Sequence, residues 1–177
     1  DVLGGADRPL ADHLAVEGRG HVPQLAARPH VDAGGQAVGL HPAGAQVPDV
    51  DFERTWQALV TLRHATSGCA LKVHSDDPAR RPLLKPEAVW EIEGAIDLRA
   101  PEIHAASVVR SEWYEAVLRL FETYDFLALP TAQVFPFSVD IHWPSEIAGR
   151  PMDSYHRWME VTALATMAGC PAASLPA

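Results

Sequence analysis

The chain is poor in lysine and cysteine and has no long hydrophobic run. Among 14 basic residues in 177 positions only Lys72 and Lys85 are lysines, and the formal net charge is -9. This composition offers no basic stripe for a phosphate backbone or an anionic lipid surface, so neither nucleic acid nor a membrane is an expected partner. No apolar run approaches the roughly 20 residues that cross a bilayer, and the first residues lack a secretory signal pattern. Together these absences predict a cytoplasmic protein.

The cysteine and histidine positions argue against a metal site. Cys69 and Cys170 are far apart in sequence, and buried thiols explain them more economically than a disulfide. His64, Cys69 and His74 are spaced in a way that suggests a zinc site, but structural zinc needs closely paired ligands and four of them. We therefore predict no metal ligands and interpret these histidines as surface or partly buried side chains.

No residue pattern in the chain provides a hydrolytic nucleophile. A serine nucleophile sits on a sharp, usually glycine-flanked turn, because its oxygen must be exposed beside converging backbone amides. None of the serines follows a glycine, and no two are adjacent. Both lysines are predicted to be solvated. Glu91 and Glu93 do not face one another on a helix, and both are predicted to be solvated helix carboxylates rather than an acid pair.

Hydrophobic periodicity predicts several helices. Apolar residues from Phe52 to Val60 indicate a helix over about 51–66 with Asp49 or Asp51 as its cap, and Lys85-Pro86 begins a short one. The strongest pattern runs over 101–124 and indicates a long amphipathic helix. Another amphipathic helix carries Tyr155, Trp158, Met159, Thr162 and Met167 and ends at Gly169, and we assign the first three of these residues to the core.

Short apolar segments between the helices predict strands. Residues 126–129 are continuously apolar, as expected for a strand buried on both faces of a parallel or mixed sheet, and residues 172–175 should re-enter that sheet. Residues 8–50 are rich in proline, glycine and histidine and are interpreted as irregular. The expected fold class is α/β: a partial layered mixed sheet flanked by helices.

Three segments carry a family resemblance. Tyr124-Asp125-Phe126-Leu127-Ala128-Leu129-Pro130-Thr131-Ala132 is followed by Pro151-Met152-Asp153-Ser154-Tyr155-His156-Arg157-Trp158-Met159 and by Ala168-Gly169-Cys170-Pro171-Ala172-Ala173-Ser174-Leu175-Pro176-Ala177. This succession resembles the C-terminal part of the amidase signature family. We therefore expect residues 1–177 to form a single partial domain, cut at both ends.

The resemblance implies a function. Members of the family hydrolyse a carboxamide to a carboxylic acid and ammonia or an amine through an acyl-serine intermediate, without a metal or organic cofactor. Their two serines and catalytic lysine lie in segments that have no counterpart here, so no catalytic residue is assigned. The parent protein is expected to be an amidase acting on a small-molecule amide, and the 177 residues alone are expected to be inactive.

The segment after the first predicted strand is the best candidate for substrate contact. It follows the carboxyl end of that strand, where open α/β sheets place ligands, and it combines aromatic walls with a few polar groups. In the family the matching loop lies near the acyl pocket, so the resemblance implies substrate-binding roles for Thr131, Gln133, Phe135 and Trp143. An equally weighted alternative is that these aromatics only fasten a loop to the core.

Two other interpretations stay open at this level. The chain is either a non-catalytic, truncated amidase remnant or a partner-binding α/β module, and its state of association distinguishes the two. A homo-oligomer is compatible with the sequence. The sequence does not identify the amide that the parent protein would cleave.

Overall fold

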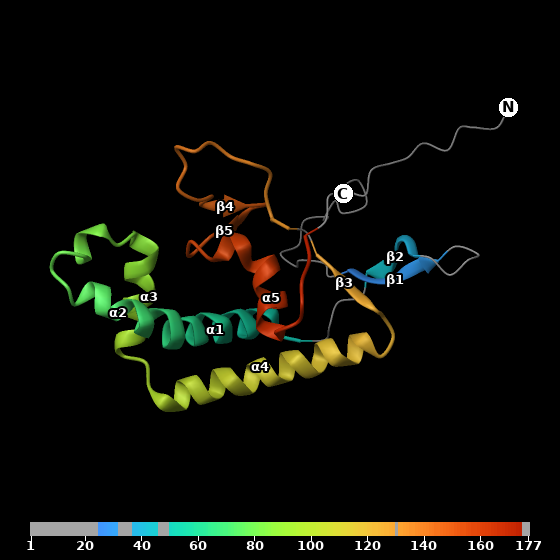
Figure 1. Cartoon of the computed structure of the whole chain (residues 1–177), viewed down its shortest axis with the longest axis horizontal. Coiled ribbons are helices and arrows are strands. Elements are labelled where there is room, and N and C mark those ends of the chain that lie inside the picture. Colours follow the sequence, from blue (N-terminus) through green and yellow to red (C-terminus); the bar gives the residue numbers. More distant parts are fainter. Residues whose placement is uncertain (1–24, 32–36, 46–49, 130, 175–177) are drawn as a thin grey trace.

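The computed structural model describes residues 25–31, 37–45, 50–129 and 131–174 of the chain, and it is rich in helices (Figure 1). The long helix α4 (Ala100–Phe121) lies along α1 (Phe52–Arg63), and α5 (Glu160–Ala168) crosses them. Two small antiparallel sheets lie at the periphery of this helical layer. No helix in these described ranges has both the length and the apolar composition of a transmembrane segment.

The helix predicted over 51–66 is confirmed and extends further than expected. Asp51 caps α1 as predicted, because its side chain accepts a hydrogen bond from the Arg54 backbone amide at 2.9 Å. After Arg63 the helical path continues through a π-helical turn, His64–Gly68, into α2 (Cys69–Ser75). Residues 64–68 therefore widen the helix locally instead of ending it.

The next two helices are also confirmed. A 3-10 turn, Arg81–Leu83, leads to α3 (Pro86–Ile96), which begins with a proline in its first turn. Helix α4 matches the strongest sequence periodicity, and its buried face packs on α1 and α5. The central side chain is Trp113, which is 1% exposed and donates its indole N–H to the Leu164 carbonyl at 3.0 Å. The main hydrophobic core consists of Ala58, Ala106, Val109, Trp113, Val117, Leu164, Met167 and Ala168.

The last helix ends where the sequence predicts. A 3-10 turn, Arg157–Met159, precedes α5, so the helix is shorter at its start than the amphipathic pattern suggests. Gly169 follows α5 with φ 70, the left-handed conformation that glycine adopts without strain. Tyr155, Trp158 and Met159, which the sequence assigns to the core, are half-buried, whereas Met167 on α5 is buried.

The sheets differ from the prediction. β1 (Leu25–Val31) pairs antiparallel with both β2 (Ala37–Ala45) and β3 (Phe126–Ala128), giving the order β2-β1-β3. The second sheet is the hairpin of β4 (Glu146–Ile147) and β5 (Arg150–Pro151). All described pairings are antiparallel, so the parallel or mixed sheet is not observed there.

Three sequence interpretations need correction. Residues 25–31 and 37–45 form strands inside the segment interpreted as irregular, because backbone pairing holds them despite prolines and glycines that hide any alternation. The strand at 126–128 exists but is not buried on both faces, since it lies at the sheet edge and Phe126 is 49% exposed. Residues 172–174 do not form a strand, and Leu175 lies outside the described residues.

Candidate functional site

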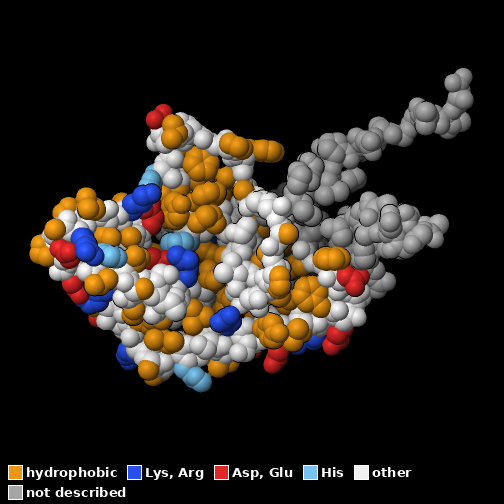
Figure 2. Space-filling view, viewed as in Figure 1, with side chains coloured by type: hydrophobic (Ala, Val, Ile, Leu, Met, Phe, Trp, Pro, Cys, Tyr) orange, Lys and Arg blue, Asp and Glu red, His pale blue; other side chains and the backbone are white. Residues whose placement is uncertain are grey.

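The predicted substrate loop follows β3 and leads to the β4–β5 hairpin (Figure 1). Residues 131–145 contain no helix or strand. Four of their large apolar side chains are exposed: Phe135 (90%), Phe137 (38%), Val139 (96%) and Ile141 (49%). Hydrophobic side chains are conspicuous on this face of the molecule (Figure 2). The loop thus presents an apolar strip on a segment that has little hydrogen bonding of its own.

The structure does not bring the four proposed substrate-binding residues into one cavity. Thr131 is exposed, Phe135 extends into solvent, and Trp143 is half-buried. Gln133 is half-buried, and its Oε1 accepts a hydrogen bond from the Val161 backbone amide at 3.1 Å. That amide belongs to the first turn of α5, which has no partner within the helix. Gln133 therefore anchors the loop to α5, and the assignment of substrate contacts stays a prediction.

Aromatic contacts fasten the centre of the loop. The Phe137 ring meets the Trp158 ring edge-to-face, with centroids 5.7 Å apart. Trp158 in turn packs edge-to-face on Tyr155 at 6.2 Å. These contacts fit the interpretation in which aromatics fix the loop to the core, and they do not exclude a ligand beside the exposed part of the strip.

A buried carboxylate that the sequence analysis misjudged lies at the centre of the helical region. Glu91 is 2% exposed, whereas Glu93 on the same helix is exposed, so the prediction of two solvated carboxylates is wrong for Glu91. Arg63 Nε donates to Glu91 Oε1 at 2.7 Å. His64 Nδ1 lies 3.1 Å from Oε2, and His156 Nε2 lies 3.2 Å from Oε1. We call these four residues the Glu91 cluster.

Two close backbone approaches build the Glu91 cluster. A Cβ on Gly68 would lie 2.1 Å from the Glu91 carbonyl oxygen, so only glycine lets the π-helical turn reach α3. A Cβ on Gly94 would lie 2.4 Å from the His64 ring, so Gly94 makes room for that ring. The Trp90 ring lies between the two histidines, 4.5 Å from His64 and 5.5 Å from His156 by ring centroids. The cluster is therefore tightly packed on several sides.

The cluster holds His156 in its neutral form. Burial, and next the charge of Arg63, lower the pKa of His156 below its ordinary value of 6.5, although the Glu91 charge acts in the opposite direction. Nε2 of this neutral imidazole lies 3.2 Å from Glu91 Oε1, a contact that carries no full charge on the ring. Nδ1 of His156 is buried and has no hydrogen-bond partner among the described residues. The arrangement suits a structural bridge better than a proton shuttle.

A second ionic network fixes the hairpin to the helices. Arg150 Nη1 lies 2.9 Å from Glu160 Oε2, and Arg150 Nη2 lies 3.1 Å from Glu53 Oε2. Arg157 also pairs with both carboxylates, and its guanidinium stacks 4.9 Å above the Trp56 ring. Burial raises the pKa of Glu160 above 4.5 against the opposing charges of Arg157 and Arg150. This network connects the β4–β5 hairpin to α1 and α5.

The nucleophile and metal candidates are not assembled into a site. Lys72 pairs with Asp76 on the surface, and Lys85 is exposed, so the prediction of solvated lysines is confirmed. His64 belongs to the Glu91 cluster, while His74 lies 3.3 Å from Arg80 Nη1. Within the part of the chain that the structure describes, no group of three histidine, cysteine or acidic side chains is arranged to hold a metal ion.

The thiols differ from one another. Both cysteines are free: Cys170 is half-buried, but Cys69 is exposed. The buried-thiol prediction is therefore wrong for Cys69, because α2 packs on its neighbours through other residues and has no buried side chain of its own.

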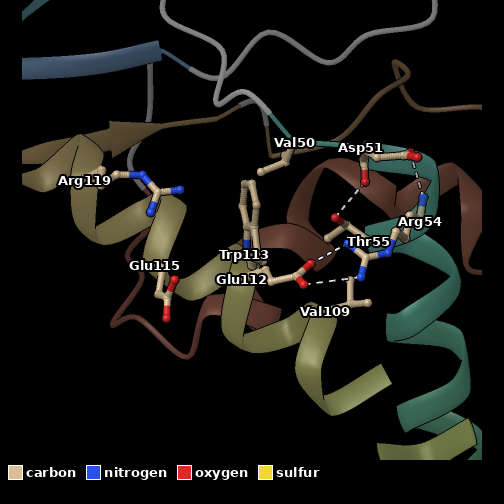
Figure 3. Close-up of a pocket in the computed structure, with 9 residues that line it drawn as sticks. All are labelled: Val50, Asp51, Arg54, Thr55, Val109, Glu112, Trp113, Glu115 and Arg119. Atoms are coloured by element: carbon tan, nitrogen blue, oxygen red, sulfur yellow. Dashed lines mark hydrogen bonds and ion pairs between the residues drawn. The ribbon is translucent and has the colours of Figure 1, made fainter. Parts of the chain in front are cut away.

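The described residues form two open grooves. One contains no residue of the predicted loop, and the other includes His142 of that loop. The first, of about 300 Å³, lies between the start of α1 and α4, with the Arg54–Glu112 ion pair on one side and Arg119 on the other (Figure 3). Trp113 and Val109 form its apolar part. The second, of about 420 Å³, lies at the start of α3 and includes His142 and Tyr155. None of Thr131, Gln133, Phe135 and Trp143 lines either groove.

Comparison with known proteins gives a structural relative but no relative by sequence. No family profile and no curated protein matches the chain. A similar solved structure is the crystal structure of a bacterial aryl acylamidase belonging to the amidase signature enzymes, with a TM-score of 0.57 and 18% sequence identity. The match covers 69% of this chain and 26% of that chain. The matched part of this chain thus has the fold of about a quarter of that amidase signature enzyme.

Proposed function

We propose that this chain is part of an amidase-type hydrolase, in which residues 131–143 shape the pocket for a carboxamide. The observation that carries the proposal is the shared fold, which extends over 69% of the chain. The three sequence segments that resemble the amidase signature family support it independently. In this proposal the substrate is a small-molecule amide, the products are a carboxylic acid and ammonia or an amine, and the protein acts in the cytoplasm.

The reaction assigned to the whole enzyme runs through an acyl-serine. A lysine-activated serine attacks the amide carbonyl, the amine leaves, and water releases the acid from the ester. Backbone donors that stabilise the oxyanion, together with acid-base catalysis, supply the rate enhancement, each contributing a few kcal/mol. No serine in this chain follows a glycine, so the 177 residues are proposed to contribute pocket shape and not the nucleophile.

The first test measures the chain alone. Purified chain is incubated with 4-nitroacetanilide, and release of nitroaniline is followed by absorbance. We expect no turnover above the buffer rate. Hydrolysis that a serine-directed fluorophosphonate abolishes would show that the chain carries its own nucleophile, and the proposed division of roles would be wrong.

The second test concerns the loop and uses a protein that joins these residues to the catalytic serines and lysine. Trp143→Ala and Thr131→Ala are expected to change the ratio of kcat/KM between an aryl amide and a small aliphatic amide by about tenfold. Glu93→Ala is the control, because Glu93 is exposed on α3 and away from the loop in sequence. Unchanged turnover and unchanged substrate preference in both loop variants would refute the pocket role.

A second function, partner binding without catalysis, is favoured by one observation. Phe135 and Val139 are each at least 90% exposed, which is unusual for large apolar side chains. Sedimentation of the chain over a range of concentrations tests it. Self-association that a Phe135→Ser/Val139→Ser double variant removes would support a truncated remnant, whereas a monodisperse monomer with cooperative unfolding would favour an independent partner-binding module.

A further inference from the structure

The groove at the start of α3 has the size of a small-molecule site. Its volume is about 420 Å³, within the range of ligand pockets, which begins at about 300 Å³. It brings together three separate parts of the chain: residues 83–88, His142 and Tyr155. None of its lining residues belongs to the Glu91 cluster or is among the four proposed substrate-binding residues.

The groove is lined by aliphatic side chains and by two aromatic rings. Leu83 is 81% exposed, and Leu84 and Ala88 are half-buried beside it. The His142 and Tyr155 rings also line the groove, with centroids 6.1 Å apart and planes inclined by 42°. Aliphatic and aromatic surfaces of this kind favour a planar apolar ligand, because both its faces leave water on binding.

The Glu87 carboxylate, which is the hydrogen-bond acceptor in the groove, already has hydrogen-bond partners. Glu87 pairs with His142 Nε2 and also accepts from its own backbone amide. Burial raises the pKa of Glu87, but these two hydrogen bonds outweigh burial and lower it below 4.5, so the carboxylate stays ionised. The groove therefore has little remaining capacity to accept a hydrogen bond from a ligand.

The donors, in contrast, are free. The Lys85 ammonium group makes no hydrogen bond or ion pair with any described residue, although its charge acts on Glu87. Lys85 is the N-cap residue of the 11-residue helix α3, and the N-terminal end of a helix favours a bound anion. A free cation beside an occupied carboxylate selects a ligand that accepts hydrogen bonds and carries negative charge.

We propose that this groove binds a small aromatic carboxylate, with the ring between the Leu84 and Tyr155 side chains and the carboxylate on the Lys85 ammonium group. The inference goes beyond amide hydrolysis and needs no nucleophile. Binding and amidase activity can therefore fail separately.

Isothermal titration calorimetry of the 177-residue chain with benzoate tests the proposal. Benzamide is the neutral probe of the same shape, and we expect it to bind about fivefold more weakly, the value of one exposed charge pair near 1 kcal/mol. Lys85→Gln should weaken benzoate binding by about the same factor and leave benzamide unaffected. Raising the salt concentration should weaken benzoate binding to the native chain only.

The chain offers a matched control for this substitution. Lys72 is the other lysine, is equally exposed, and pairs with Asp76 on α2. Lys72→Gln removes the same charge from the protein, and we expect it to leave benzoate affinity unchanged. Leu84→Ser is expected to weaken both probes alike, because it removes apolar wall and no charge.

Three results would overturn the proposal. The first is the absence of benzoate binding to the native chain, and the second is equal affinity for benzoate and benzamide. The third is equal weakening by Lys72→Gln and Lys85→Gln, which would show a general charge effect. His142 belongs both to this groove and to residues 131–143, but Thr131 and Trp143, which carry the test of the amidase role, do not line the groove, so that test stays separate.

Discussion

The Glu91 cluster and the 131–145 loop differ in which side chains they bury and which they expose to water. The cluster buries a carboxylate and satisfies it with Arg63, His64 and His156, in a space that Gly68 and Gly94 keep open. The loop exposes phenylalanine and valine to water and is held by a few contacts, such as the Gln133 hydrogen bond to α5. Polar groups are inside in one region, and large apolar groups are outside in the other.

This difference separates what stabilises the fold from what is available for binding. A buried ionic cluster is sensitive to any change in shape or charge, because an unpaired buried charge is costly. An exposed apolar strip contributes little to stability and is free to meet a ligand, a partner or another part of an enzyme. The Glu91 cluster therefore serves the structure of the chain, whereas recognition by the loop stays a proposal.

The largest expected effect comes from filling the space at Gly68. A methyl group there would lie 2.1 Å from the Glu91 carbonyl oxygen, which is backbone and cannot move aside cheaply. We expect Gly68→Ala to lower the free energy of unfolding by about 3 kcal/mol, measured by urea unfolding with tryptophan fluorescence. Gly149→Ala is the control: nothing lies within 4 Å of its Cβ, and its φ of +79 predicts a strain cost of about 1 kcal/mol. Equal losses in both variants would contradict the tight contact.

Removal of the buried carboxylate should come next. Glu91→Ala leaves Arg63 and two histidines without their shared acceptor, and we expect a loss of about 3 kcal/mol or slightly less, as the vacated site can admit water. Glu93→Ala, two residues away and exposed, should change stability by less than about 0.5 kcal/mol. Similar values for the two variants would show that Glu91 is solvated after all.

The pH dependence of stability sharpens the role of His156. Its pKa is lowered in the folded chain, so the unfolded chain binds more protons as pH falls through 6.5. Stability should therefore decrease as the solution is acidified from neutral pH through this window. His156→Gln should reduce that decrease. The decrease is measured as the difference in unfolding free energy between neutral pH and a pH below 6.5. If His156→Gln kept the native dependence of stability on pH, His156 would not be the group that causes it.

The smallest effect is expected in the loop. Phe135→Ser changes a side chain that is 90% exposed, and we expect the unfolding free energy to change by less than about 0.5 kcal/mol. Gln133→Ala removes the hydrogen bond to the Val161 amide and should cost about 1 kcal/mol. If Phe135→Ser were the more damaging of the two, the strip would be packed and not exposed.

The sequence predicted the helices well because their apolar residues recur with helical spacing. Helix α4 and the Gly169 stop of α5 follow directly from that pattern. Glu91 was missed because a charged residue is rarely buried. A signal was present, since Ala88 and Ala95 lie three and four residues from Glu91 and share its helix face.

The sheet was less predictable. β1 and β2 contain prolines and glycines, and their pairing depends on contacts between segments that no local pattern records. The candidate site was predicted in part: residues 131–143 do form a loop directly after β3. The binding of Gln133 to α5 and the separate groove at Lys85 depend on tertiary packing, and the sequence contains no signal for either.

The coding DNA upstream of Asp1 gives the most direct test of the amidase proposal. The account predicts an in-frame lysine followed by a Gly-Ser-Ser-Gly-like loop, which would supply the base and the two serines that act on the pocket proposed at residues 131–143. A start codon immediately before Asp1, with neither element in frame, would contradict the proposal for this protein.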